Sequence, residues 1–228
     1  MTPAPSLNTV LSRIGETQAP LPAAAAVLVG LAALAAVSLQ EIWLVARHVN
    51  VIAHEGAHAV IGSAAGRKVR GVTLRSNADG KTRLDPGKMP GNITIGVVGY
   101  LGPSAIGLGA AKLIQLGHSV AVLWRALLLL AVLLTTMRNF FGILAVLLTG
   151  WLLYVVVRYA SVGAETVAAC GLSWFLLLSG VRMVVDDGIR AGDAGILAGI
   201  THIRPVMWVR LWLVGTAIAL GVGGVLLL

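Results

Sequence analysis

Two histidines and a glutamate stand close together in the chain, in the order His54, Glu55 and His58, which is an H-E-x-x-H pattern. On an α-helix, residues four positions apart share one face, so both imidazoles can bind one zinc ion while Glu55 lies beside the metal. Zinc lowers the pKa of a bound water to roughly 7, and a nearby carboxylate can accept the proton and pass it to a leaving amine. This spacing is typical of a zinc hydrolase with Glu55 as its acid/base.

A pattern with three fixed positions also occurs by chance, so its surroundings decide how it is interpreted. The motif lies within the apolar run from Ile42 to Ala65. Ionisable side chains inside a bilayer cost on the order of several kcal/mol unless they are paired, bound to a metal or hydrated, and they are functional by default. The setting favours the zinc site. The alternative is a polar packing or pore cluster without metal.

A catalytic zinc ion usually has three protein ligands and one open position, so one more ligand is expected. The candidates are three acids late in the chain, Asp186, Asp187 and Asp193. Asp193 stands at the start of a short apolar helix candidate, and Asp187 precedes Gly188 at the end of a long apolar segment. For any one of these acids, helix capping or a loop position is the ordinary role. We predict Asp193 as the third ligand and keep Asp187 and Asp186 as alternatives.

The elements that must hold these side chains are long and apolar. Of 228 residues, 57% are hydrophobic and 11% are charged, against roughly a quarter charged in soluble proteins. Inside lipid the backbone must form its own hydrogen bonds, and blocks of Leu, Ala, Val and Gly are unlike the alternating strands of a barrel. We therefore expect an all-α polytopic transmembrane bundle of about six or seven helices. The apolar segments are 21–38, 42–65, 93–111, 119–137, 140–157, 165–185 and 206–228.

The rest of the composition bounds the domain organisation and the partners. Residues 1–20 are polar and contain prolines, which predicts a flexible tail ahead of one integral membrane domain at 21–228. Cys170 is the only cysteine, so an intrachain disulfide or a cysteine-based metal knuckle is excluded. The net charge is +8, yet the basic residues mostly stand between apolar blocks. These basic residues are interpreted as signals of which side of the membrane each loop faces. Nucleic acid is therefore not an expected partner.

Lys and Arg in short loops predict the orientation of the helices. If the N-terminus is cytoplasmic, then the basic 66–92 loop, the turn at Arg138 and the loop carrying Arg190 and Arg204 also face the cytoplasm. We expect a multi-pass protein of a bacterial plasma membrane with its active site toward the cytoplasm. The segments 119–137 and 140–157 are joined by a tight turn, and if either one is re-entrant, every later loop changes sides. The basic residues of the 66–92 loop are Arg67, Lys68, Arg70, Arg75, Lys81, Arg83 and Lys88.

Two local patterns lie near the membrane surface. In the 66–92 loop, β-forming residues flank the turn-forming stretch 77–80, which predicts a small β-hairpin. The alternative is a solvated basic linker that binds anionic lipid. Asn139 is expected to cap the tight turn beside Arg138, and the alternative is that it stabilises a substrate carbonyl. The glycines at 99 and 102 are expected to allow close helix packing.

With these residues in place, the chain resembles the site-2 protease class of intramembrane zinc metalloproteases, and more closely its compact bacterial branch. The resemblance is carried by His-Glu-Gly-Ala-His at 54–58, Gly-Tyr-Leu-Gly-Pro at 99–103, and Gly-Asp-Ala at 192–194 followed by Ile-Thr-His-Ile at 200–203 and by Trp208. It implies zinc held by His54, His58 and a downstream aspartate, with Glu55 as the catalytic acid/base. The chain lacks the Leu-Asp-Gly stretch that usually supplies the third ligand, of which Asp187 and Gly188 form only a fragment, and it has no inserted PDZ-like domain.

The resemblance implies an enzyme that uses Zn²⁺ to hydrolyse a peptide bond in or near a transmembrane segment, in regulated proteolysis. Its expected partners are a transmembrane protein substrate and the lipid bilayer. The alternative is a catalytically inactive membrane scaffold or assembly factor that retains the zinc-site helix. A metal or proton transporter would need polar residues along a full path across the membrane. The apolar segments outside the one that contains His54 have no continuous row of acids or histidines.

Overall fold

The computed structural model describes residues 7–87, 91–188 and 192–228, so the topology signals assigned to Lys88 and Arg190 lie outside the described residues. Most of the described chain is helical. The elements, in chain order, are α1 (Leu7–Ser12), α2 (Ala23–Ser38), α3 (Gln40–Ala64), β1 (Val69–Leu74), β2 (Gly80–Leu84), α4 (Gly91–Gln115), α5 (Ser119–Thr136), α6 (Phe140–Tyr159), α7 (Val162–Asp187), α8 (Gly192–Thr201) and α9 (Pro205–Leu227).

Helix α4 is central to the bundle and packs against α3, α7 and α9. Its buried face is rich in small residues, which lets neighbouring backbones approach closely where no large side chain intervenes. A β-carbon at Gly102 would meet the β-carbon of Ala57 on α3, and one at Gly96 would meet Leu197 on α8. The small residues of α4 therefore let both α3 and α8 approach this helix closely.

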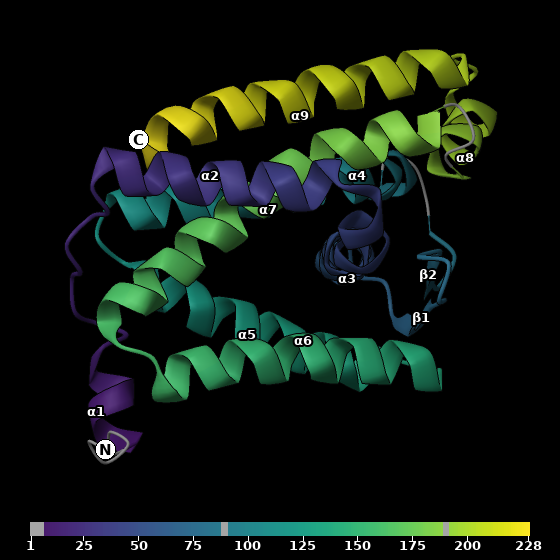
Figure 1. Cartoon of the computed structure of the whole chain (residues 1–228). Coiled ribbons are helices and arrows are strands. Elements are labelled where there is room, and N and C mark those ends of the chain that lie inside the picture. The colour runs from purple at the N-terminus through teal and green to yellow at the C-terminus, as the bar shows by residue number, and fades with distance from the viewer. Residues whose placement is uncertain (1–6, 88–90, 189–191) are drawn as a thin grey trace.

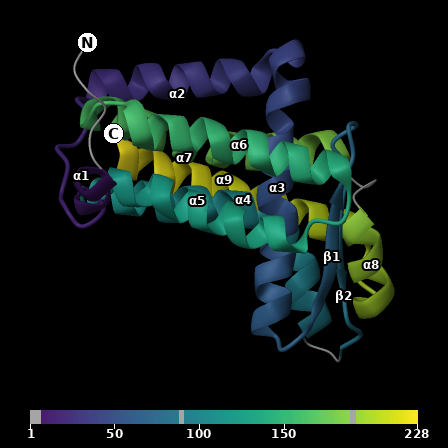
Figure 2. The same cartoon turned by 90° about the horizontal axis from the view of Figure 1, so that it is seen from below.

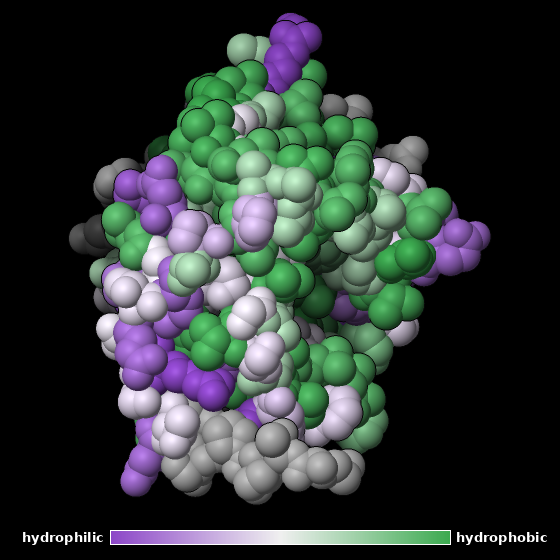
Figure 3. Space-filling view, turned by 60° about the vertical axis from the view of Figure 1, so that its left-hand side comes forward, coloured by the Kyte–Doolittle hydropathy of each residue, from purple (hydrophilic) through white to green (hydrophobic). Residues whose placement is uncertain are grey.

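Five helices, α4, α5, α6, α7 and α9, are long and apolar enough to cross a membrane, and α2 with α3 forms a bent pair that passes the same test together. Large apolar side chains point outward from these helices, as lipid-facing residues do. Figure 3 shows hydrophobic residues over the broad upper part of one face, with hydrophilic residues gathered at its lower left. The predicted all-α membrane bundle is confirmed, and both α5 and α6 are full-length helices. Exposed examples are Leu128, Val132, Phe140, Leu148, Trp151 and Val225.

The N-terminal half of the topology differs from the prediction. The segment 42–65 was expected to cross the membrane on its own, but α3 is bent by 100° from α2 and runs across the other helices (Figure 2). The structure therefore places α1 and the end of α9 at one end of the bundle and the hairpin at the other (Figure 1). The expectation that the N-terminus shares a side with the 66–92 loop depends on a separate crossing by 42–65, whereas α2 and α3 pass the length and hydropathy test as one bent pair.

Side chains of α7 hold the bend between α2 and α3. Leu39, at the break, has an extended backbone. The Arg182 guanidinium donates to the carbonyl of Val37 (3.2 Å) and to Asp186 (2.7 Å), so it satisfies a carbonyl that the broken helix leaves free. Asp186 also accepts a 2.8 Å hydrogen bond from the indole of Trp43 on α3. Both arms of the bend are thus tied to the same turn of α7.

The part of the N-terminal segment that the structure describes contacts the far end of the bundle. Gln18 is buried, and its backbone nitrogen donates to the carbonyl of Gly117 at 2.7 Å. Its side-chain oxygen accepts from the nitrogen of Val120 at 3.1 Å, in the first turn of α5. Arg13 forms an ion pair of 3.4 Å with the buried Glu165 of α7. These contacts lie at the opposite end from the hairpin.

The predicted β-hairpin is confirmed, as an antiparallel β1–β2 pair in which Val72 lies opposite Thr82. The outer edge of β1 pairs with the α5–α6 turn, where the nitrogen of Arg138 donates to the carbonyl of Val72 at 2.9 Å. Asn139 was expected to cap the turn, but its side chain makes no cap hydrogen bond. Its amide instead donates to the carbonyl of Leu74 (2.6 Å) and accepts from the nitrogen of Leu74 (3.1 Å). Asn139 thus extends the β-ladder for one residue.

Candidate metal centre

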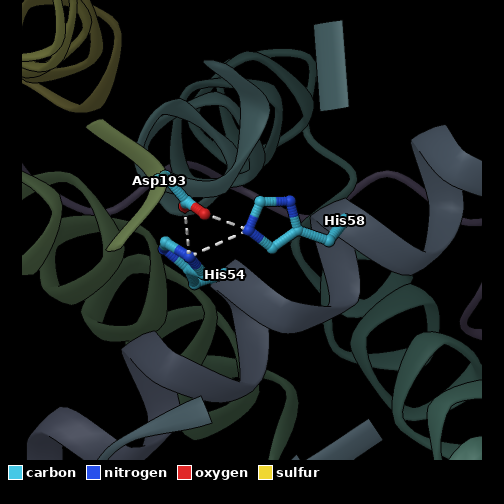
Figure 4. Close-up of side chains that lie close together, drawn as sticks. All are labelled: His54, His58 and Asp193. Atoms are coloured by element: carbon cyan, nitrogen blue, oxygen red, sulfur yellow. Dashed lines mark hydrogen bonds and ion pairs between the residues drawn. The ribbon is translucent and has the colours of Figure 1, made fainter. Parts of the chain in front are cut away.

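Three side chains from two elements converge at the hairpin end of the bundle. His54 and His58 lie one turn apart on α3, and Asp193 lies in the first turn of α8. The Nε2 atoms of the histidines are 3.1 Å apart, and each is 3.2 Å from Oδ2 of Asp193 (Figure 4). Ligand atoms about 2.0–2.1 Å from a tetrahedral zinc are roughly 3.3 Å from one another. The three atoms therefore have the spacing of three corners of a zinc tetrahedron.

A second contact of His58 indicates that a cation belongs between these three ligand atoms. Nδ1 of His58 lies 2.8 Å from the carbonyl oxygen of Ile95, and a carbonyl can only accept, so Nδ1 carries the proton. In the neutral ring, Nε2 then presents a lone pair to Asp193 Oδ2, which is also an acceptor. A cation between them turns this repulsion into attraction. Metal-bound histidines commonly donate their other ring nitrogen to a carbonyl in this way, which sets the tautomer.

The charge of the site is also suited to a cation. Burial alone would raise the pKa of the Asp193 carboxyl, but a protonated His54 or His58 ring can donate to this carboxylate, and that holds the pKa below its usual range. The aspartate is therefore ionised at neutral pH. It would bring one negative charge to a divalent ion, while the imidazoles bring lone pairs and no charge.

Helix α4 closes the site on one side. A β-carbon at Gly99 would lie 2.5 Å from Nε2 of His58 and 2.7 Å from Nε2 of His54, so any larger residue would collide with both rings. The next residue, Tyr100, packs its ring against His54 at a centroid distance of 4.7 Å and stacks on Trp212 of α9 at 4.5 Å. Gly99 makes room for the imidazoles, and Tyr100 supports one of them.

The other two candidate acids are engaged elsewhere. Asp187 accepts a 2.7 Å hydrogen bond from the hydroxyl of Tyr100, and Asp186 is held by Trp43 and Arg182. Within residues 7–87, 91–188 and 192–228, the group of His, Cys, Asp or Glu side chains whose ligand atoms converge closely enough for one ion is His54, His58 and Asp193. The structure thus brings together the three predicted ligands and excludes the two alternatives from this group.

Glu55 is buried on α3 next to the ligands, with 4% of its surface exposed. Its carboxylate oxygen Oε2 accepts a 2.6 Å hydrogen bond from the hydroxyl of Thr82 on β2. The sequence did not single out Thr82, because a threonine in a short strand carries no local signal of its partner. The predicted hairpin and the need of a buried carboxylate for a donor were the two clues available.

The chain was compared with known families, curated proteins and solved structures. The model of the family described as Peptidase M50B-like matches residues 27–223, a range that includes the HExxH helix, α4, the hairpin and Asp193. No curated protein and no solved structure matches the chain. The match covers most of the chain and agrees with a bundle of membrane-span-like helices that contains a cluster able to hold a metal ion. The chain belongs to the Peptidase M50B-like family, the site-2 protease family of membrane metallopeptidases.

Proposed function

We propose that this chain is an intramembrane zinc metalloprotease that hydrolyses a peptide bond in or near a transmembrane segment of a membrane protein. The observation that carries the proposal is that two imidazole nitrogens from the helix that bears Glu55 and one carboxylate oxygen from α8 lie within 3.2 Å of one another. Ionisable groups gathered this way in an apolar bundle are costly unless a function retains them.

The residues divide into holders of the metal and a carrier of protons. His54, His58 and Asp193 would hold Zn²⁺, which, when bound, supplies a water of lowered pKa and polarises the scissile carbonyl. Glu55 takes a proton from the attacking water on its carboxylate and delivers it to the leaving amine. The carbonyl of Ile95 keeps His58 in the tautomer whose Nε2 is free for the metal, and Tyr100 keeps the ring of His54 in place.

We further propose that the substrate reaches the site from the cytoplasmic side and in an extended form. Basic residues gather at the hairpin end, among them Arg67, Arg70, Arg75 and Arg138, as expected for a cytoplasmic face. A peptide bond inside a helix is hydrogen bonded and shielded, so local unwinding must precede cleavage. In the described part of the chain, the outer edge of β2 pairs with no strand, and an unwound segment can add there as a further strand.

The experiment compares the wild type with Glu55→Gln in lipid vesicles that contain a panel of fluorescently labelled single-span peptides. We expect the wild type to retain about one zinc per chain and to cleave a member of the panel. Glu55→Gln should retain zinc and thermal stability but lose at least about 100-fold in rate, since acid–base catalysis contributes roughly 10²–10⁴-fold. A Glu55→Gln variant that cleaves at the wild-type rate would contradict the proposal, and a wild type that cleaves no member of the panel would favour the inactive scaffold.

A further inference from the structure

We propose that Thr82 is a positioning residue for Glu55, so that the β-hairpin is part of the catalytic machinery. The proposal rests on the proposed function. It starts from one short contact, in which Thr82 Oγ1 lies 2.6 Å from Oε2 of Glu55 and 3.1 Å from the backbone oxygen of the same residue. A hydroxyl has one proton, and both of these oxygens only accept, so the shorter contact to the carboxylate is the principal hydrogen bond.

The hydrogen bond matters because the carboxylate is buried. A hydroxyl that donates to an ionised carboxylate at 2.5–2.7 Å forms a charge-assisted hydrogen bond, which is roughly twice as strong as a neutral one. With Oε2 occupied by Thr82, Oε1 is the oxygen that remains to receive the proton of the attacking water. Thr82 therefore selects which oxygen of Glu55 does the chemistry and holds it in one orientation.

The backbone of β2 confines the same carboxylate from a second direction. A β-carbon at Gly80 would collide with Oε1 of Glu55 and would lie 2.6 Å from its Cγ and 2.7 Å from its Cδ. The side chain of Glu55 is thus held between its own helix and the first residues of β2. A rotation of the carboxylate away from Thr82 is limited by Gly80.

The alternation of β2 shows that Thr82 occupies the strand face that meets α3. Lys81 and Arg83 are exposed, whereas Thr82 and Leu84 are half-buried. Leu84 packs on α3 at Gly62, where a β-carbon would lie 2.6 Å from its Cδ1. At such a packing position, valine would fill the same space as threonine and suit a strand equally well. The hydroxyl is therefore the feature of Thr82 that packing and strand formation do not explain.

The hairpin that carries Thr82 is anchored on its other side. Val72, directly opposite Thr82, accepts a hydrogen bond from the nitrogen of Arg138, and the next outer position of β1, Leu74, pairs with Asn139. The α5–α6 turn thus fixes β1, β1 fixes β2, and β2 presents the hydroxyl to Glu55. This chain of contacts gives Thr82 the rigidity that a positioning role needs.

The kinetic test compares Thr82→Val, which removes the hydroxyl at constant shape, with Thr82→Ser, which retains it. In the vesicle assay with labelled single-span peptides, we expect kcat of Thr82→Val to fall about 10-fold or more with KM within about twofold. Zinc content should match the wild type, and Thr82→Ser should keep kcat within about threefold. Wild-type kcat in Thr82→Val, or an equal loss in both variants, would overturn the positioning role. If the proposed function itself is wrong, Glu55→Gln will not reduce cleavage either. This result distinguishes failure of the proposed function from failure of the positioning role.

A second measurement tests the contact without any catalysis. Cys170 is the only cysteine, so Cys170→Ala gives a cysteine-free background for engineered pairs. Glu55→Cys combined with Thr82→Cys should form a disulfide under mild oxidation, because Thr82 Oγ1 lies 3.1 Å from the backbone oxygen of Glu55, so the backbones of these positions are close. The control pair, Glu55→Cys with Arg83→Cys, should not cross-link, because Arg83 points to the opposite face of β2. Equal cross-linking of both pairs, or none in the Thr82 pair of a folded protein, would overturn the proposal.

Discussion

The hydroxyl of Tyr100 donates a 2.7 Å hydrogen bond to the carboxylate of Asp187, while the ring of the same tyrosine packs against His54. One aromatic side chain thus lies between the metal centre and the acid that the family pattern would have offered as the third ligand. Asp193, from the next helix, reaches the position between the two imidazoles instead. The two acids are six residues apart in the sequence, yet they have different partners and we expect them to have different functions.

The first prediction separates these two acids. Asp193→Asn should weaken zinc binding by more than the roughly 10–100-fold that loss of an outer partner costs, because it removes a charged ligand. Asp187→Asn leaves the ligand set intact, so its loss of zinc affinity should not exceed that roughly 10–100-fold. Zinc content after dialysis against a graded chelator series, measured by mass spectrometry, gives both affinities. The assignment of Asp193 is contradicted if Asp187→Asn is the variant that loses its metal.

A second prediction concerns the space beside the imidazoles. Gly99→Ala should reduce zinc affinity, because the added methyl group would lie 2.5–2.7 Å from the ring atoms of His58 and His54 and must push them apart. Gly109→Ala is the matched control on the same helix, since nothing lies within 4 Å of its added carbon. It should leave zinc binding unchanged and stabilise the helix by up to about 1 kcal/mol. Isothermal titration with zinc would compare the two, and equal affinities would argue against the crowded site.

The third prediction concerns the anchor of the hairpin. Asn139→Ala removes two hydrogen bonds to Leu74 and should destabilise the attachment of β1 by about 1–3 kcal/mol. Backbone amides of β1 should then exchange with deuterium faster, and kcat should fall because Thr82 loses its support. Thr135→Val serves as control, since the hydroxyl of Thr135 donates to the carbonyl of Val132 in its own helix. Unchanged exchange in Asn139→Ala would show that the hairpin is held by other contacts.

The fourth prediction concerns the metal itself. A ligand that binds only the folded state stabilises it by about 2.7 kcal/mol at 100 times its dissociation constant. The melting temperature of the wild type should therefore rise with free zinc, and chelation should reverse the rise while the helical circular dichroism persists. In His54→Ala the dependence should be lost. If that variant responds to zinc as the wild type does, the stabilising ion binds elsewhere.

Local patterns in the sequence were sufficient for several features of this protein. The pairing of His54 with His58 follows from a spacing of four residues on one helix, and the helical bundle follows from apolar blocks as long as a bilayer is thick. The β-hairpin follows from a turn between two β-forming stretches, and the close approach of α4 follows from the glycines at 99 and 102. Each of these depends on residues that are near one another in the chain.

Only the tertiary structure decided which acid joins the histidines, where Asn139 bonds, and that Thr82 meets Glu55. Asp193 and His58 are 135 positions apart, and the bend between α2 and α3 is held by Arg182, which is 145 positions from Val37. That bend lies between α1 and the hairpin, which are at opposite ends of the bundle (Figure 1). Contacts over such separations depend on how complete helices pack together, and packing is a property of surfaces that no short stretch of sequence contains.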